Sequence, residues 1–300
     1  MTLAPTYTIP YLSYIDPDAH EWILSDLGLP NGYVCTGISG ATGIPVSLQS
    51  IPVLGGTAVP LLYLPQPNTL TLGVYLETPP GGTENDYYKL LDAFVRAFYN
   101  RRNDVPAPGY LVVGRPDGTK RQLAVYCIAG LDTADHGILN AVYGLSLEAP
   151  DPHWQDQQAQ QVLYSLSTAT GILPLLPVFL GGGTVLGTSL VVNDGGAIAY
   201  PVWTITGPGT PTIQNITTGR QWSLGTAIPA GQIVTVSTVP NQQYVYNNTT
   251  ATSWWNNLVI STSRDLWSLQ VGDNQINIQL SGATANSSIQ LSWTRRWQRA

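Results

Sequence analysis

The side chains suited to catalysis or metal binding gather in a few short polar segments. Residues 16–21 place His20 beside Asp16, Asp18 and Glu21, a mixture of nitrogen and oxygen ligands that could hold a metal ion. No second motif in the sequence completes such a ligand set. Because aspartate also closes backbone turns, we favour a turn that leads into a short helix or strand.

The other two histidines give equally little support for catalysis. Asp132, Asp135 and His136 offer carboxylates and an imidazole for acid–base chemistry, but a loop between strands explains the same composition. His153 follows an Asp-Pro pair and is interpreted as a domain-boundary residue. The sequence contains no nucleophile elbow, phosphate-binding loop or dinucleotide-binding glycine motif. We therefore predict no catalytic residue, no metal site, no cofactor and no enzymatic activity.

Binding has better support, from two adjacent tryptophans. Trp254 and Trp255 lie in a polar segment, residues 247–257, that is rich in asparagine and threonine. Neighbouring side chains of an extended chain point to opposite sides, so at least one of the two should lie off the core. An exposed tryptophan could stack on a sugar or anchor a neighbouring protein. Trp254 and Trp255 are therefore candidate interface or glycan contacts.

The composition indicates a folded chain with unusually little charge. Charged residues make up 10% of the 300 residues and hydrophobic residues 43%, whereas an ordinary soluble domain is about 25% charged. The surface is then either polar and uncharged or largely covered by partners. Residues 1–164 carry 7 Lys/Arg and 15 Asp/Glu, and residues 165–300 carry 5 and 3. Since no basic stripe exists, we predict no specific binding of nucleic acid.

One apolar stretch, residues 171–192, needs to be tested against a membrane span. It contains Pro174, Pro177 and the glycine run 181–183, which a transmembrane helix would rarely combine. Two short strands or an extended connection between domains is favoured, and a segment that touches a membrane is the alternative. The two cysteines, Cys35 and Cys127, are expected to be free thiols, although a single disulfide is open.

The sequence predicts one amphipathic helix over residues 84–100. Thr83 and Asp86 have the spacing of a capping box at its start. Apolar residues recur at spacings of three and four and form one stripe, namely Tyr87, Leu90, Leu91, Phe94, Val95 and Phe98. A helix with such an aromatic face packs on a sheet or closes the end of a barrel.

Strands surround this helix. Residues 69–76 alternate and end at the segment 79–82, Pro-Pro-Gly-Gly. Residues 109–115 and 122–128 are joined by an Asp-Gly pair, a strong hairpin signal. Two prolines in the segment 147–154 then close the first domain.

The rest of the chain reads as short alternating strands. In the segment 200–209, Trp203 and Ile205 fall on one face, opposite a face of β-branched residues. Turns about 8–12 residues apart indicate a sandwich. We predict a mainly β protein: an N-terminal β-barrel or sandwich with one amphipathic helix, followed by a second β-sandwich. The expected domains are residues 1–155, a linker with entry strands over 156–195, and a sandwich core over 196–300.

The second domain resembles a known family. The matching segments are residues 200–208, 211–215 with the turn 218–219, 230–232, 266–274, and 291–293 with Arg295. They resemble the C-terminal galectin-like sandwich of the distal tail proteins of siphophages. Residues 147–154 are similar to that family's passage out of its ring-forming domain. The resemblance covers most of residues 140–300 in order and the first half only in outline.

This resemblance implies a structural virion protein at the tail tip. The expected assembly is a hexameric ring that joins the tail tube to the baseplate hub and leaves a channel for genome passage. The implied partners are further copies of the chain, the tail tube protein, the hub or tail-associated protein, and other tail-tip or receptor-binding proteins. The implied location is the virion, after assembly in the host cytoplasm. An acidic first domain would suit a DNA-conducting channel, because like charges repel.

Two other functions stay open. A carbohydrate-binding, lectin-like module for attachment to the host surface would use Trp254 or Trp255. The cluster of His, Arg and Glu with a Trp that true galectins use for sugar is not recognisable in the sequence, so we favour a protein contact for these tryptophans. A hydrolase would need a catalytic constellation, which the sequence lacks.

Overall fold

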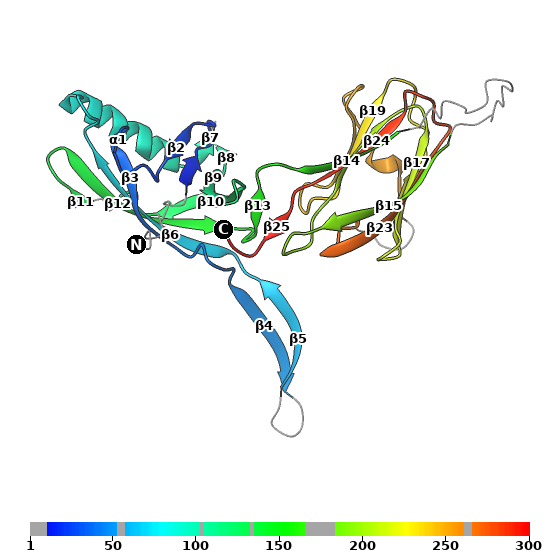
Figure 1. Ribbon diagram of the computed structural model, residues 1–300, viewed down its shortest axis with the longest axis horizontal. Coiled ribbons are helices and arrows are strands. Elements are labelled where there is room, and N and C mark those ends of the chain that lie inside the picture. Colours follow the sequence, from blue (N-terminus) through cyan, green and yellow to red (C-terminus); the bar gives the residue numbers. More distant parts are fainter. Residues whose placement is uncertain (1–10, 53–57, 103–104, 133–134, 166–183, 261–265) are drawn as a thin grey trace, which may run out of the picture. The chain divides into compact units, whose positions relative to one another are not determined.

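The computed structural model describes residues 11–52, 58–102, 105–132, 135–165, 184–260 and 266–300. The chain divides into two compact units, Met1–Gln157 with Trp297–Ala300, and Gln158–Arg296. Strands dominate both units and the described residues contain one α-helix (Figure 1), which confirms the mainly β prediction. None of the helices in the described part is long and apolar enough to cross a membrane. Residues 171–183 of the apolar stretch lie outside the described residues, and its remainder belongs to a strand.

The first unit is built on one continuous sheet. Every second side chain of its longest strands is buried, as in β6, where Leu70, Leu72, Val74 and Leu76 face the core. The strands in spatial order are β2 (Glu21–Ile23), β1 (Leu12–Ile15), β9 (Gly109–Gly114), β10 (Lys120–Ala129), β12 (Asn140–Ala149), β6 (Asn68–Glu77) and β3 (Tyr33–Ser39). The short strands β11 (Asp135–His136) and β13 (Trp154–Asp156) pair with β12 and β10.

The predicted hairpin between β9 and β10 is confirmed. The Asp117 carboxylate accepts hydrogen bonds from the Thr119 N–H at 2.9 Å and from the Thr119 hydroxyl at 2.6 Å. Gly118 follows with φ of +82°, a conformation that glycine adopts without steric cost. The Asp-Gly pair therefore sets the register of the two strands.

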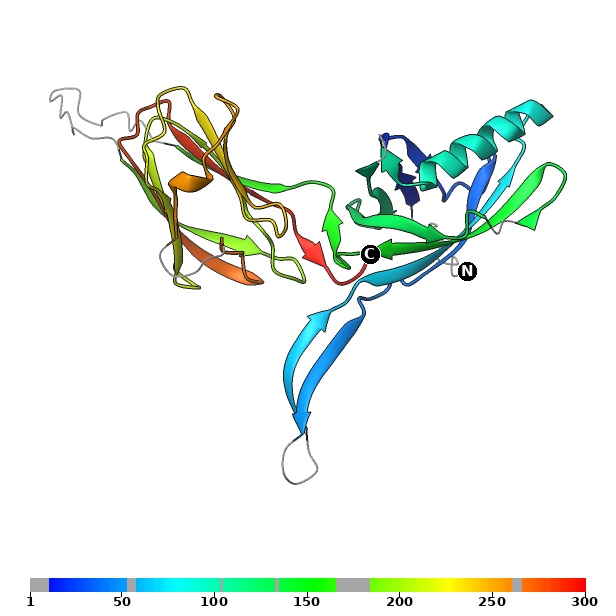
Figure 2. The same cartoon turned by 180° about the vertical axis from the view of Figure 1, so that it is seen from behind.

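Helix α1 (Glu84–Phe98) crosses the sheet of the first unit (Figures 1 and 2). The Thr83 N–H and hydroxyl both donate to the Asp86 carboxylate, at 3.0 and 2.7 Å, which confirms the predicted capping box. The apolar stripe faces the sheet, and its Phe94 ring lies 5.0 Å from that of Tyr143. The predicted end at residue 100 is two residues too late.

Asn100 explains this early end. Its φ of +51° is left-handed and cannot continue a right-handed helix. The Asn100 amide donates to the Tyr14 hydroxyl at 2.9 Å and accepts the Cys127 N–H at 2.6 Å. Tyr14 in turn donates to the Ala97 carbonyl at 3.2 Å, and burial raises the pKa of its phenol. The neutral phenol thus links the end of α1 to β1 and β10.

The last four residues, Trp297–Ala300, belong to the first unit. The Trp297 indole N–H donates to the Asp156 carboxylate at 2.8 Å, and the Arg121 guanidinium carbon lies 3.8 Å from the centre of the indole ring. Arg121 also donates to the Arg299 carbonyl at 2.9 Å. The sequence analysis placed these residues in the second domain, and this assignment is corrected. Strand β25 (Arg296–Trp297) pairs with β13.

The second unit is a sandwich of two sheets whose facing sides form its core. The six-stranded sheet runs β14 (Gln160–Ser165), β24 (Ser288–Trp293), β16 (Val202–Thr206), β19 (Ile233–Ser237), β20 (Tyr244–Asn247), β21 (Thr252–Ser253). The five-stranded sheet runs β15 (Thr184–Asn193), β23 (Gly272–Ser281), β17 (Thr210–Asn215), β18 (Arg220–Leu224), β22 (Leu258–Ile260). The galectin-like identity of this sandwich stays a prediction.

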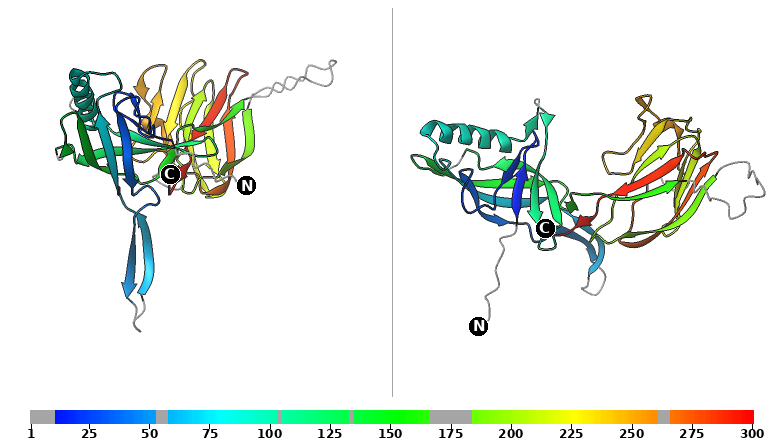
Figure 3. Two further views of the ribbon diagram at one scale, coloured as in Figure 1. Left: turned by 60° about the vertical axis from the view of Figure 1, so that its left-hand side comes forward. Right: turned by 45° about the horizontal axis from the view of Figure 1, so that its top comes forward.

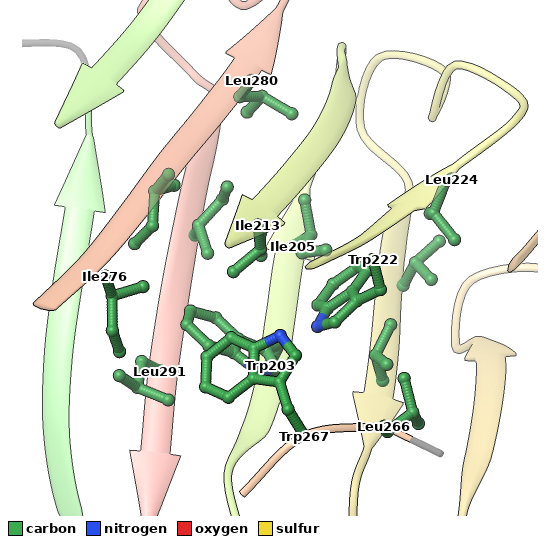
Figure 4. Packing of buried hydrophobic residues seen from close by; sticks show 14 of the residues in the cluster. Trp203, Ile205, Ile213, Trp222, Leu224, Leu266, Trp267, Ile276, Leu280 and Leu291 are labelled. Carbon is green, nitrogen blue, oxygen red and sulfur yellow. The ribbon is translucent and has the colours of Figure 1, made fainter. Parts of the chain in front are cut away.

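Three tryptophans fill the middle of this sandwich (Figure 4). The Trp203 ring lies 6.1 Å from Trp222 and 5.5 Å from Trp267, in edge-on arrangements that aromatic rings prefer. Trp203 and Ile205 are fully buried, as the alternation of the segment 200–209 predicted. The segment ends at Gly209, where φ is +146° and a Cβ would lie 2.7 Å from the Leu280 side chain.

Two further hairpins belong to the first unit. Strands β4 (Val46–Pro52) and β5 (Ala58–Pro65) pair with each other and with no other described strand. They continue beyond the pair β3 and β6, and this hairpin extends away from the sheet in Figures 1 and 2 and in the left view of Figure 3. The second hairpin joins β7 (Arg101–Arg102) to β8 (Val105–Pro106) directly after α1.

Replacing Asn100 by alanine should destabilise the first unit by roughly 2–4 kcal/mol, because it leaves the part-buried Cys127 N–H without an acceptor and the Tyr14 hydroxyl oxygen without a donor. Urea unfolding followed by circular dichroism measures this loss. Asn241→Ala is the matched control, since Asn241 is exposed and also has a left-handed φ, of +61°. An equal loss in both variants would attribute the effect to backbone strain and contradict the hydrogen-bond account.

Candidate assembly interface

The first candidate metal site is a turn. The Asp16 carboxylate accepts the Asp18 N–H at 3.0 Å, the His20 N–H at 2.9 Å and the Trp22 indole N–H at 3.1 Å. These three donors close the connection from β1 to β2, which confirms the turn predicted from the sequence. Within the described ranges, no group of three or more His, Cys, Asp or Glu side chains could hold a metal ion.

The other two histidines and the two cysteines lie in strands or directly beside them. His136 lies in the short strand β11, which pairs with β12, so the predicted loop is in part a strand, and residues 133–134 lie outside the described ranges. The His153 ring nitrogen Nδ1 lies 2.8 Å from the Asp151 carboxylate, at the entrance to β13. Cys35 and Cys127 are free thiols, and burial raises the pKa of both, which disfavours the reactive thiolate.

The two candidate tryptophans differ in exposure, as the sequence predicted for neighbours. Trp254 packs against the core of the second unit, and its backbone N–H donates to the Val245 carbonyl at 2.8 Å. Trp255 opens the short 3-10 helix η1 (Trp255–Asn257) and is 43% exposed. Trp255 is thus the one available to a partner, and the role of both residues in binding stays a prediction.

The β4–β5 hairpin carries the most extended apolar surface of the first unit. Leu48 is opposite Tyr63 in the register and Gln49 is opposite Leu62, so the two leucines lie on different faces of the ribbon. Leu48 is 60% exposed and Leu62 47%. The other exposed apolar side chains of the hairpin are Val46, Ile51, Leu61 and Leu64. A two-stranded ribbon with apolar residues on both faces is marginal in water and gains stability from a partner.

A second apolar projection is the turn between β11 and β12. Ile138 at this turn is 92% exposed, and Val142 on β12 is also exposed. Exposed apolar residues at the end of a hairpin are suited to insertion into a neighbouring surface. The sequence analysis missed both hairpins as contact surfaces.

Charge at the end of α1 is partly neutralised. Arg96 and Arg102 lie 3.8 and 4.0 Å from the Asp18 carboxylate. All three side chains are largely exposed, so these ion pairs contribute little to stability. They do reduce the basic character that Arg96, Arg101 and Arg102 would otherwise give to this surface.

No family model and no curated protein matches the sequence. Solved structures do match in fold. The SPP1 Dit protein (gp 19.1), described as a paradigm of the hub adsorption apparatus in phages that infect Gram-positive hosts, is 10% identical with a TM-score of 0.63. This match covers 95% of the chain and 98% of that protein.

Two structures of the phage p2 baseplate in its activated conformation, with Sr and with Ca, match at 9% identity and a TM-score of 0.57. They cover 97% of this chain and 100% and 99% of theirs. The chain therefore has, over both of its units, the fold of the SPP1 Dit hub protein and of a chain of the p2 baseplate.

Proposed function

We propose that the protein is a structural component of a phage tail tip, a distal tail ring that joins the tail tube to the baseplate hub. The observation that carries this proposal is the extent of the fold match, which spans 95% of this chain and 98% of SPP1 Dit. A shared sandwich alone would be weak support, because common folds host many functions. A match in both units and in their order supports a shared role in the hub, and a structural role without enzymatic activity.

The β4–β5 hairpin supports self-association. Its exposed leucines would be covered if each copy laid its hairpin on the next copy around a ring, in a head-to-tail contact that closes. The expected stoichiometry is six, from the family resemblance. The tail tube protein, the hub protein and other tail-tip proteins are the further partners in this proposal.

Charge is consistent with a channel for the genome. Residues 1–164 carry 15 acidic against 7 basic residues, and like charge would keep DNA from adhering to the wall. Asp18 pairs with Arg96 and Arg102, which weakens the positive potential of the main basic cluster in the first unit. A channel wall lined by Arg96, Arg101 and Arg102 would contradict this part of the proposal.

The hairpin gives a direct test of ring formation. The double variant Leu48→Glu with Leu62→Glu should convert rings into monomers of 32.3 kDa, because charge on both faces prevents burial of the ribbon. Light scattering and negative-stain images of the same sample measure this change. Leu163→Glu is the matched control, since Leu163 is an exposed leucine on β14 of the second unit.

The control variant should form rings with the same mass as the unmodified protein. Rings that persist in the double variant would exclude the hairpin from the assembly contact. A protein that is monomeric in solution but assembles on isolated tail tubes would retain the proposed function and lose only the self-assembly step. Failure to join either kind of assembly would contradict the proposal itself.

The second candidate function is a lectin-like module, favoured by the exposure of Trp255. Trp255→Ala should leave both the ring mass and the melting temperature unchanged, because the side chain is exposed at the surface. We expect glycan-array binding to be the same for this variant and the unmodified protein, since we assign Trp255 to a protein contact. Glycan signals that disappear in the variant would instead assign the residue to sugar binding.

A further inference from the structure

The second unit contains a pocket that the proposed assembly role does not use. It is open to solvent on one side and has a volume of about 370 Å³, which lies within the range of small-molecule sites, about 300–1,000 Å³. All of its lining residues belong to the second unit. Those that matter for recognition are Tyr200, Arg220, Asn241, Gln243 and Ser268. Leu266 also lines the pocket and belongs to the core cluster of the three tryptophans (Figure 4).

Hydrogen bonds hold the walls of this pocket in place. Ala199 and Leu269 exchange two backbone hydrogen bonds, at 3.0 and 2.8 Å, which fixes Tyr200 beside Ser268. Thr238 donates both its N–H and its hydroxyl to the Pro201 carbonyl, at 3.2 and 2.8 Å. The turn that carries Asn241 is closed by a bond from the Gln242 N–H to the Val239 carbonyl at 3.0 Å. A pocket with fixed walls loses little entropy when it binds a ligand.

The electrostatic character of the pocket is positive. Among the described residues that line it, Arg220 carries a charge and none is a carboxylate. The structure gives the Arg220 guanidinium no partner among the described residues. The Arg220 charge favours an anionic group on the ligand.

The neutral lining groups narrow the ligand class further. Asn241, Gln243 and Ser268 each present atoms that accept as well as donate hydrogen bonds. A bare anion only accepts, so it would use the donor atoms of these side chains and leave their acceptor atoms to water. Sugar hydroxyls donate and accept in the same way, and the Tyr200 ring offers an apolar face for the C–H side of a sugar.

We propose that this pocket binds a saccharide that carries a carboxylate or a phosphate group. Arg220 holds the acidic group, and Asn241, Gln243 and Ser268 bind hydroxyls. A tail-tip protein with such a site could contact acidic polysaccharide on a cell surface. The inference rests on the pocket alone, so it stands or falls separately from the ring proposed above and from Trp255.

The test is a ligand-detected NMR titration of the full chain with glucuronic acid, glucose 6-phosphate, glucose and inorganic phosphate. We expect the two acidic sugars to bind at least about tenfold more tightly than glucose or phosphate, since hydrogen bonds to charged groups are the stronger ones. Arg220→Gln should weaken both acidic sugars about tenfold or more and leave the weak binding of glucose nearly unchanged. Arg220→Lys should give an intermediate loss of affinity, because lysine keeps the positive charge but lacks the planar guanidinium group with its paired N–H donors.

Arg102→Gln is the matched control, because it removes a guanidinium that is also exposed but belongs to the first unit. It should leave all four affinities unchanged, and melting temperatures should show that every variant is folded. The proposal is overturned if no acidic sugar binds, if glucose or phosphate binds as tightly as the acidic sugars, or if Arg220→Gln has no larger effect than Arg102→Gln. Loss of sugar binding in Trp255→Ala but not in Arg220→Gln would also overturn it and move the site to η1.

Discussion

The hydrogen bonds of Asn100 determine how the first unit is put together. Asn100 stops α1, reverses the chain, and fixes the helix end to β1 and β10 through Tyr14 and Cys127. A buried amide must satisfy both its donor and its acceptor, so only one placement of the helix on the sheet meets the requirement. The Phe98 ring, stacked on Tyr14 at 4.1 Å, follows from that placement.

The periodic elements of this fold could be predicted from the sequence, because their signals are local. The capping box of Thr83, the Asp-Gly turn of the β9–β10 hairpin and the alternation around Trp203 each depend on neighbours in the chain. The return of Trp297 to the first unit could not be predicted in the same way. Its partners Arg121 and Asp156 are far away in the sequence, and no local pattern links them.

The candidate contact surfaces were harder to predict for a physical reason. The leucines of β4 and β5 have the spacing of a core strand, and only the structure shows that nothing described covers them. The pocket of the second unit is assembled from turns, where single residues such as Asn241 carry the site and no periodicity marks them. That at least one of Trp254 and Trp255 lies off the core could be predicted, because adjacent side chains of an extended chain point to opposite sides, but which of the two is exposed could not.

The path of the chain has a mechanical consequence. The second unit begins after Gln157 and ends before Trp297, so the chain passes between the two units twice. A force that pulls on the second unit is therefore shared between two covalent connections and is not carried by one alone. The returning segment is held in the first unit by Arg121 and Asp156, so a load on it passes through these side-chain contacts to β10 and β13.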